Sequence, residues 1–143
     1  MAGAYYSTVF DQPVERVWAA IRDFGAYTVW VDGVDESGIE DGKAGDTVGA
    51  VRSIRMGERH IRQRLLAHSD LECCYTYEFC TPPPAPLANY RATIRASPIS
   101  DGNRAFVEWQ ATFDCAPADI DHWSGFYAAS FGTWLASLRA HLG

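Results

Sequence analysis

Alternating hydrophobic and polar residues are clearest between positions 104 and 115. The hydrophobic side chains that share one face of this segment are Ala105, Val107, Trp109, Ala111 and Phe113. Polar residues fill the other face, with Phe106 as the one exception. A period of two with one apolar side is typical of a strand in an antiparallel sheet that is buried on one face. The pattern therefore predicts such a strand here.

The same period predicts the other strands. They are expected at residues 4–10, 33–40 (weakly), 47–56, 59–69, 72–80 and 89–97. Turn-forming residues separate several of them, at 41–46, 57–58 and 101–103. Residues 81–86 contain four prolines, which cannot continue a hydrogen-bonded ladder. This segment is expected to form a stiff, exposed loop.

Helical periodicity appears at both ends of the chain. Pro13 is a favourable first-turn residue, and Val14, Val17, Trp18 and Ile21 follow it at helical spacing. A second short helical piece is expected around residues 24–30. From Pro117 to about Leu142, a long helix carries an apolar stripe of Ile120, Trp123, Tyr127, Phe131, Trp134, Leu135, Leu138 and Leu142.

The order of these elements predicts an α+β fold. Consecutive strands with short connections form an antiparallel meander, and the final helix is the only large element able to cover one face. A sheet of about seven strands wrapped around one helix leaves room for a cavity. No repeat or linker divides the 143 residues, so one domain over residues 1–143 is expected.

Composition narrows the classes of function. A net charge of −6 argues against a nucleic-acid surface, and the arginines between positions 52 and 64 are interpreted mainly as a solvated sheet edge. No segment resembles a signal peptide or a membrane span. Cys73, Cys74, Cys80 and Cys115 lack zinc-site spacing, so reduced cysteines, no metal and a cytoplasmic location are expected. Aromatic residues make up 13% of the chain, enough to line a pocket as well as a core.

Several short motifs, in order along the chain, resemble one family. They are Pro13-Val14-Glu15-Arg16-Val17-Trp18, Asp23-Phe24 with Trp30, Val48-Gly49-Ala50-Val51-Arg52, Asn89-Tyr90-Arg91-Ala92-Thr93 and Val107-Glu108-Trp109. Together with the final helix they resemble the START-like (SRPBCC) superfamily, in its polyketide cyclase/dehydrase and lipid-transport branch. The resemblance implies a helix-grip fold that binds a small hydrophobic molecule between sheet and helix without a cofactor.

The resemblance also implies which side chains would face the ligand. The positions carried over are Thr28, Val31, Arg52, Ile54, Met56, Ile61, Gln63, Tyr77, Phe79, Leu87, Tyr90, Ala92, Ile94, Val107, Trp109, Ala111, Phe126, Ser130 and Trp134. Most are apolar, whereas Arg52 and Gln63 would form the polar end of the cavity. The lysine that holds the carboxylate of plant hormones in receptors of this fold is absent near Thr28. The loop at 81–87 is either a lid or merely a rigid turn.

Three classes of function stay open at this point. The first is binding of a hydrophobic ligand without chemistry. The second is a polyketide cyclase or dehydratase, with Arg52, Tyr77 and Tyr90 as catalytic candidates that stabilise an enolate or relay a proton. The third is a protein-interaction module resembling co-chaperones, with a possible homodimer through the strand at 4–10. Common nucleophile, phosphate-binding and zinc motifs are absent from the sequence, and its four histidines are scattered.

Overall fold

A seven-stranded antiparallel sheet forms the body of the protein in the computed structural model, which describes residues 2–143. The strands are β1 (Ala2–Phe10), β2 (Glu36–Ile39), β3 (Val51–Met56), β4 (Arg59–Ser69), β5 (Cys74–Phe79), β6 (Ala88–Ile99) and β7 (Arg104–Asp114). Their spatial order is β1-β7-β6-β5-β4-β3-β2, so β2 to β7 form a meander and β1 joins beside β7. The predicted antiparallel meander is confirmed.

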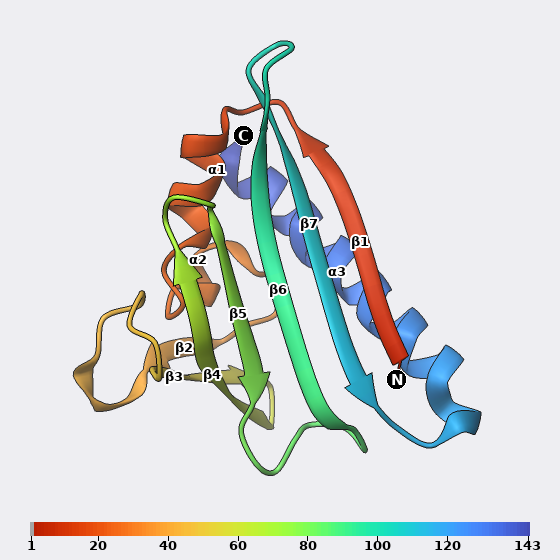
Figure 1. Ribbon diagram of the computed structural model, residues 1–143. Helices are drawn as coiled ribbons and strands as arrows, with labels where there is room; N and C mark the ends of the chain where they lie inside the picture. The colour runs from red at the N-terminus through yellow and green to blue at the C-terminus, as the bar shows by residue number, and fades with distance from the viewer. Residues whose placement is uncertain (1) are drawn as a thin grey trace.

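The helices lie on one side of this sheet (Figure 1). They are α1 (Val14–Ile21), α2 (Tyr27–Trp30) and α3 (Ile120–Leu142), with 3-10 turns at Glu40–Gly42 and Pro117–Asp119. The long helix α3 runs across the sheet behind β6, β7 and β1 in Figure 1. The arrangement is the expected α+β helix-grip fold. Within residues 2–143, no helix combines the length and the apolar character that crossing a bilayer requires.

The structure changes three of the predicted boundaries near the start of the sheet. The strand expected at 47–56 begins only at Val51, because Thr47 and Ala50 close a turn and Gly49 has a φ of +92°. The weak strand at 33–40 shrinks to Glu36–Ile39, and the turn at 41–46 opens with the 3-10 turn. Glycine adopts positive φ without the strain that a Cβ would cause, so Gly42 and Gly49 favour a loop here rather than a hydrogen-bonded strand.

The core lies between the sheet and α3. The alternating face of β7 is buried as predicted, and so are Tyr75 and Tyr77 of β5. Trp109 stacks on Phe131 of α3 with ring centroids 4.8 Å apart and planes only 7° apart. Phe131, Leu135 and Leu138 are fully buried, so this half of the helix is held mainly by apolar contact.

Helix α3 also packs closely against the edge strand β1. A Cβ on Gly132 would lie 3.0 Å from the ring of Tyr6, so a glycine allows the helix and strand to approach closely. The guanidinium of Arg139 donates hydrogen bonds to Thr8 Oγ1 and to the Val9 carbonyl oxygen. These contacts fix the position of the helix along the sheet.

Candidate functional site

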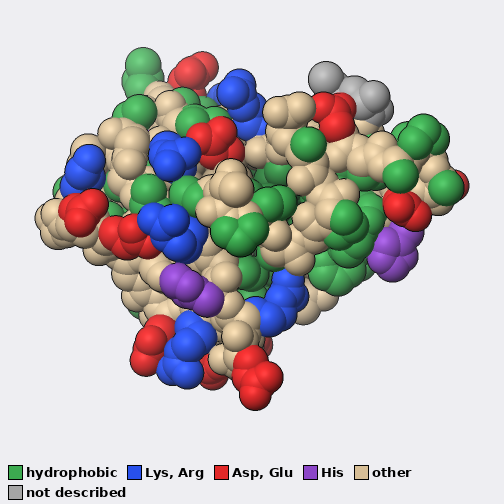
Figure 2. Space-filling view, turned by 90° about the horizontal axis from the view of Figure 1, so that it is seen from below, with side chains coloured by type: hydrophobic (Ala, Val, Ile, Leu, Met, Phe, Trp, Pro, Cys, Tyr) green, Lys and Arg blue, Asp and Glu red, His purple; other side chains and the backbone are tan. Residues whose placement is uncertain are grey.

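A cavity of about 220 Å³ lies between the sheet and the first half of α3. Its wall combines residues of α2, β3, β4, β5, β6 and α3 with Pro84 of the loop after β5. The end of β5, the start of β6 and the start of α3 lie at the lower end of the molecule in Figure 1. Figure 2 shows this end, where hydrophobic side chains gather in a central hollow and charged side chains of both signs surround it.

Most of the predicted ligand-facing side chains line this cavity. They are Val31, Ile54, Met56, Ile61, Gln63, Tyr77, Phe79, Tyr90, Phe126, Ser130 and Trp134. The alternation of β3 to β5 and the spacing of four on α3 place them on the correct faces. Their position fits a role in binding, which itself stays a prediction.

The other predicted positions lie away from the cavity wall. They are Thr28, Arg52, Leu87, Ala92, Ile94, Val107, Trp109 and Ala111. Those on β6 and β7 point to the correct face but are buried in the core, since α3 packs directly on this part of the sheet. Thr28 instead bonds Ser37 of β2 through its backbone N–H, and Leu87 is buried beside the start of β6.

Five lining residues were not predicted: Tyr27, Val34, Arg59, Pro84 and Tyr127. The apolar stripe of the final helix already contained Tyr127, so helical spacing could have found it. Tyr27 directly precedes a predicted position, but only the short helix α2 turns its ring inward. Arg59 begins β4 at the hairpin, where its charge gives no sign of a place beside a cavity.

Arg52 is fully buried rather than part of a solvated edge, so that interpretation is wrong for this arginine. Its Nε donates a 2.6 Å hydrogen bond to Gln63 Oε1, and its Nη1 donates to the Phe24 carbonyl oxygen at 3.2 Å. The guanidinium carbon lies 3.6 Å from the ring centroid of Tyr27 and 4.0 Å from that of Phe24. No carboxylate within residues 2–143 pairs with it, so the faces of aromatic rings stabilise the charge.

Gln63 connects this buried cation with the cavity. Its Oε1 is held by Arg52, which leaves the amide nitrogen as the polar group available at the wall. That nitrogen has no hydrogen-bond partner among residues 2–143. The hydroxyl of Tyr27 and Nη2 of Arg52 are buried and likewise have no hydrogen-bond partner within residues 2–143. Of these groups, the Gln63 amide nitrogen and the Tyr27 hydroxyl belong to the cavity wall, and both can donate a hydrogen bond.

The tyrosines of the wall are neutral at ordinary pH. Burial raises the pKa of Tyr27, Tyr77 and Tyr90 well above the usual value. Burial also raises the pKa of Tyr127 to about 12, against the opposing influence of the nearby Arg59 charge. Trp109 Nε1 donates to the Tyr77 hydroxyl at 3.2 Å, so this hydroxyl already serves as an acceptor in the core. These phenols can donate hydrogen bonds but are weak proton donors.

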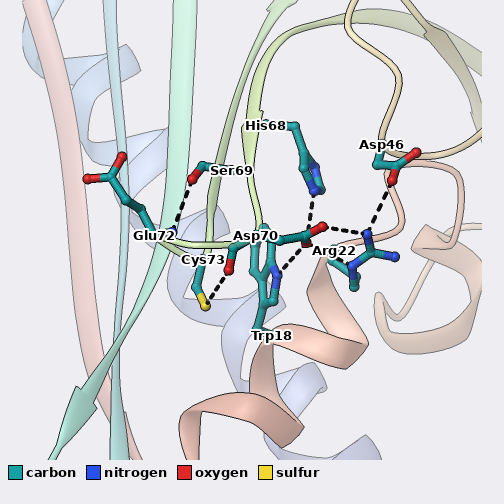
Figure 3. A network of polar contacts seen from close by, with 8 residues as sticks. All are labelled: Trp18, Arg22, Asp46, His68, Ser69, Asp70, Glu72 and Cys73. Atoms are coloured by element: carbon teal, nitrogen blue, oxygen red, sulfur yellow. Dashed lines mark hydrogen bonds and ion pairs between the residues drawn. The ribbon is translucent and has the colours of Figure 1, made fainter.

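A second polar cluster lies at the opposite end of β4, where Asp70 accepts several hydrogen bonds (Figure 3). Its carboxylate accepts from Trp18 Nε1 at 2.9 Å, from Arg22 at 2.9 and 3.0 Å, and contacts His68 Nε2 at 3.0 Å. Asp46, His68 and Asp70 together have the spacing of metal ligands. However, Arg22 already provides a cation to both carboxylates, so the cluster is explained as a tie between α1 and the end of β4.

Comparison with solved structures gives the same fold. A protein from Thermobifida fusca is 28% identical, with a TM-score of 0.89 over 100% of this chain and 94% of that one. The protein XoxI from Bacillus cereus is 25% identical, with a TM-score of 0.86 over 99% of this chain and 96% of that one. BexL, a di-domain ARO/CYC of the BE-7585A biosynthetic pathway, is 14% identical with a TM-score of 0.82, over 99% of this chain and 46% of that one. At that identity BexL shows the fold alone.

The comparison with curated proteins produced no match. The family model described as polyketide cyclase/dehydrase and lipid transport matches residues 1–143. This agrees with the resemblance inferred from the sequence motifs and with the helix-grip arrangement of the sheet and α3. The chain therefore belongs to the polyketide cyclase/dehydrase and lipid-transport family of the SRPBCC type.

Proposed function

We propose that the protein binds a small, largely hydrophobic molecule in the cavity between the sheet and α3. The observation that carries the proposal is the wall itself, which combines Tyr77, Phe79, Tyr90 and Trp134 with the single amide of Gln63. Apolar walls with a few fixed polar groups are the usual form of a small-molecule site. The family, which includes lipid-transport proteins, supports the same class of function.

The size of the cavity limits the ligand. Its volume of about 220 Å³ is below the roughly 300–1,000 Å³ of pockets that enclose drug-sized ligands. A compact molecule of one or two rings suits this space better than a two-chain lipid or a long polyketide. We therefore place the ligand among small aromatic or short-chain molecules.

The polar end of the cavity favours ligands that carry a hydrogen-bond acceptor. The free amide hydrogens of Gln63 can donate to a carbonyl, ether or phenol oxygen, and the contact from Arg52 holds the amide in that orientation. A ligand without such an oxygen would leave the amide unpaired in a dry cavity, which costs about 1–3 kcal/mol. The ligand is thus expected to carry at least one oxygen at its buried end.

A cyclase or dehydratase is the second candidate function. The family and the location of Tyr77 and Tyr90 on the wall favour it. Two observations weigh against it: burial raises the pKa of both phenols, and Tyr27 and Phe24 cover the charge of Arg52. Turnover of an aromatic polyketide precursor by wild type, lost in Arg52→Met and Tyr90→Phe, would establish the enzyme instead of the simple binder.

The binding proposal is tested with 2-naphthol as a probe, which has two rings and one oxygen. Tryptophan fluorescence of Trp134 on the wall should change on binding, and the melting temperature should rise with probe concentration. Ser130→Phe projects a ring into the cavity and should abolish the response. Ala129→Phe, on the exposed side of the same helix, is the matched control and should bind like wild type. Equal binding by wild type and Ser130→Phe would overturn the proposal.

The remaining expectations accompany this proposal. We propose one domain over residues 1–143 and a cytoplasmic location, which the four free cysteines fit. Homodimerisation through β1 and a protein-interaction role are weaker candidates, since Arg139 already occupies the Val9 carbonyl oxygen of that strand. Sedimentation velocity would decide the oligomeric state directly.

A further inference from the structure

Arg59 differs from the exposed arginines around it. On β3 and β4, Arg55 pairs with Glu36, Arg62 with Glu40 and Arg64 with Glu78, each at 2.8–2.9 Å. Arg59 is also exposed, yet it forms no ion pair within residues 2–143. Among these four residues, it is also the one that lines the cavity.

The hairpin holds Arg59 at the mouth of the cavity. Arg59 pairs with Met56 across the turn, and Met56 is itself part of the wall. Glu58 lies in this turn and Asp35 contacts it, yet neither carboxylate pairs with Arg59 within residues 2–143. Asp35 Oδ2 instead accepts a 2.7 Å hydrogen bond from the Gly57 N–H. The positive charge acts on the cavity side, since it opposes the rise in the pKa of the Tyr127 hydroxyl on the opposite wall. An unpaired guanidinium therefore faces a largely apolar hollow.

We infer that Arg59 selects ligands that carry a carboxylate at the end lying at the mouth of the cavity. This inference rests on the proposed function and names its ligand class: an aromatic body with a neutral oxygen toward Gln63 and an acid toward Arg59. The acid belongs at the mouth rather than beside Arg52. A carboxylate moved to the buried end would lose all its water, whereas at Arg59 it stays partly hydrated while it gains a charged hydrogen bond.

The test compares 6-hydroxy-2-naphthoic acid with its carboxamide, which has the same shape but no charge. Wild type should bind the acid about three- to tenfold more tightly than the amide at low salt, in the range of a partly exposed ion pair. The preference should shrink as salt screens the charge. Titration of tryptophan fluorescence gives both dissociation constants.

Variants of the hairpin assign the preference to one residue. Arg59→Gln should bind acid and amide equally, Arg59→Lys should keep part of the preference, and Arg59→Glu should reverse it. Arg55→Gln is the matched control, because Arg55 lies on the same hairpin but outside the cavity wall and is paired with Glu36. It should leave the preference unchanged.

The outcomes separate this inference from the proposed function. If wild type binds the amide but has no preference for the acid, or if Arg59→Gln keeps the preference, the carboxylate inference is wrong and the binding function stands. If neither compound binds and 2-naphthol fails as well, the proposed function fails and the inference falls with it.

Discussion

Arg52 and Gln63 are cross-strand neighbours on β3 and β4, and the guanidinium Nε donates to the amide oxygen at 2.6 Å. Both side chains are buried, so neither can exchange the partner for bulk water. Replacing one partner alone leaves a polar group unpaired in the interior, which costs more than the bond itself contributes. The pair is therefore expected to behave as one unit.

This expectation gives the first prediction. Gln63→Leu should lower the free energy of unfolding by about 2–4 kcal/mol, because it leaves a buried charge without its strongest acceptor. Arg52→Met should also destabilise, yet the double variant should lose about 1–3 kcal/mol less than the sum of the two. Urea unfolding of all four proteins measures the coupling. Additive losses would show that the two side chains act independently.

The second prediction separates core from cavity along α3. Phe131→Ala removes a fully buried ring that stacks on Trp109 and should cost about 3–5 kcal/mol of stability. Phe126→Ala removes a ring that is 45% exposed and should cost less than about 1 kcal/mol, while weakening 2-naphthol binding. Thermal and urea unfolding, with fluorescence titration, measure both effects. A loss of stability at Phe126 equal to that at Phe131 would contradict the assignment.

The third prediction concerns the link between α2 and α3. The hydroxyl of Ser137 donates to the Trp30 carbonyl oxygen and accepts the Asp32 N–H at 2.9 Å. Ser137→Ala leaves both backbone groups unpaired and should cost about 1–3 kcal/mol. Ser130→Ala is a matched control on the same helix, since its hydroxyl bonds only the Phe126 carbonyl of its own helix. That change should be nearly neutral in urea unfolding, and a similar loss in both variants would refute the link.

The fourth prediction is a pH dependence of stability. Hydrogen bonds from Arg22, then Trp18 and His68, lower the pKa of Asp70 well below its usual value of about 4. A lowered pKa in the folded state means that the contribution is complete above about pH 4 and is lost as pH falls through the folded value. Asp70→Asn should therefore melt below wild type at pH 7, and the difference should disappear in acid. A difference that stays constant down to pH 2 would argue against this role of the charge.

The alternation of residues predicts most of the fold, because a strand with one buried face needs an apolar residue at every second position. The strand expected at 59–69 has the same bounds as β4, and the apolar set from Ala105 to Phe113 is buried as expected. The boundaries near Thr47 were less predictable. There Gly49 allows a turn within a stretch that otherwise alternates.

The sequence predicts the face of the cavity better than its position along the strands. Trp109 and Tyr77 lie on the same side of the sheet, but α3 packs directly on Trp109 and leaves space beside Tyr77. That difference depends on where α3 crosses the sheet, and the local alternation of residues does not predict that position. The resemblance placed Arg52 at the polar end of the cavity, but its aromatic surroundings could not be predicted, for a similar reason. The rings that surround it come from Phe24, Tyr27, Tyr75 and Tyr77, which are distant in sequence.

Helix α3 divides its residues between two tasks. Phe126, Ser130 and Trp134 line the cavity, whereas Leu135, Leu138 and Leu142 in the last turns pack only in the core. Substitutions at Phe126 and Ser130 would alter which molecule fits while leaving the core contacts of Leu135, Leu138 and Leu142 in place. Gene duplicates of such a scaffold can therefore diverge toward new ligands without losing the ability to fold.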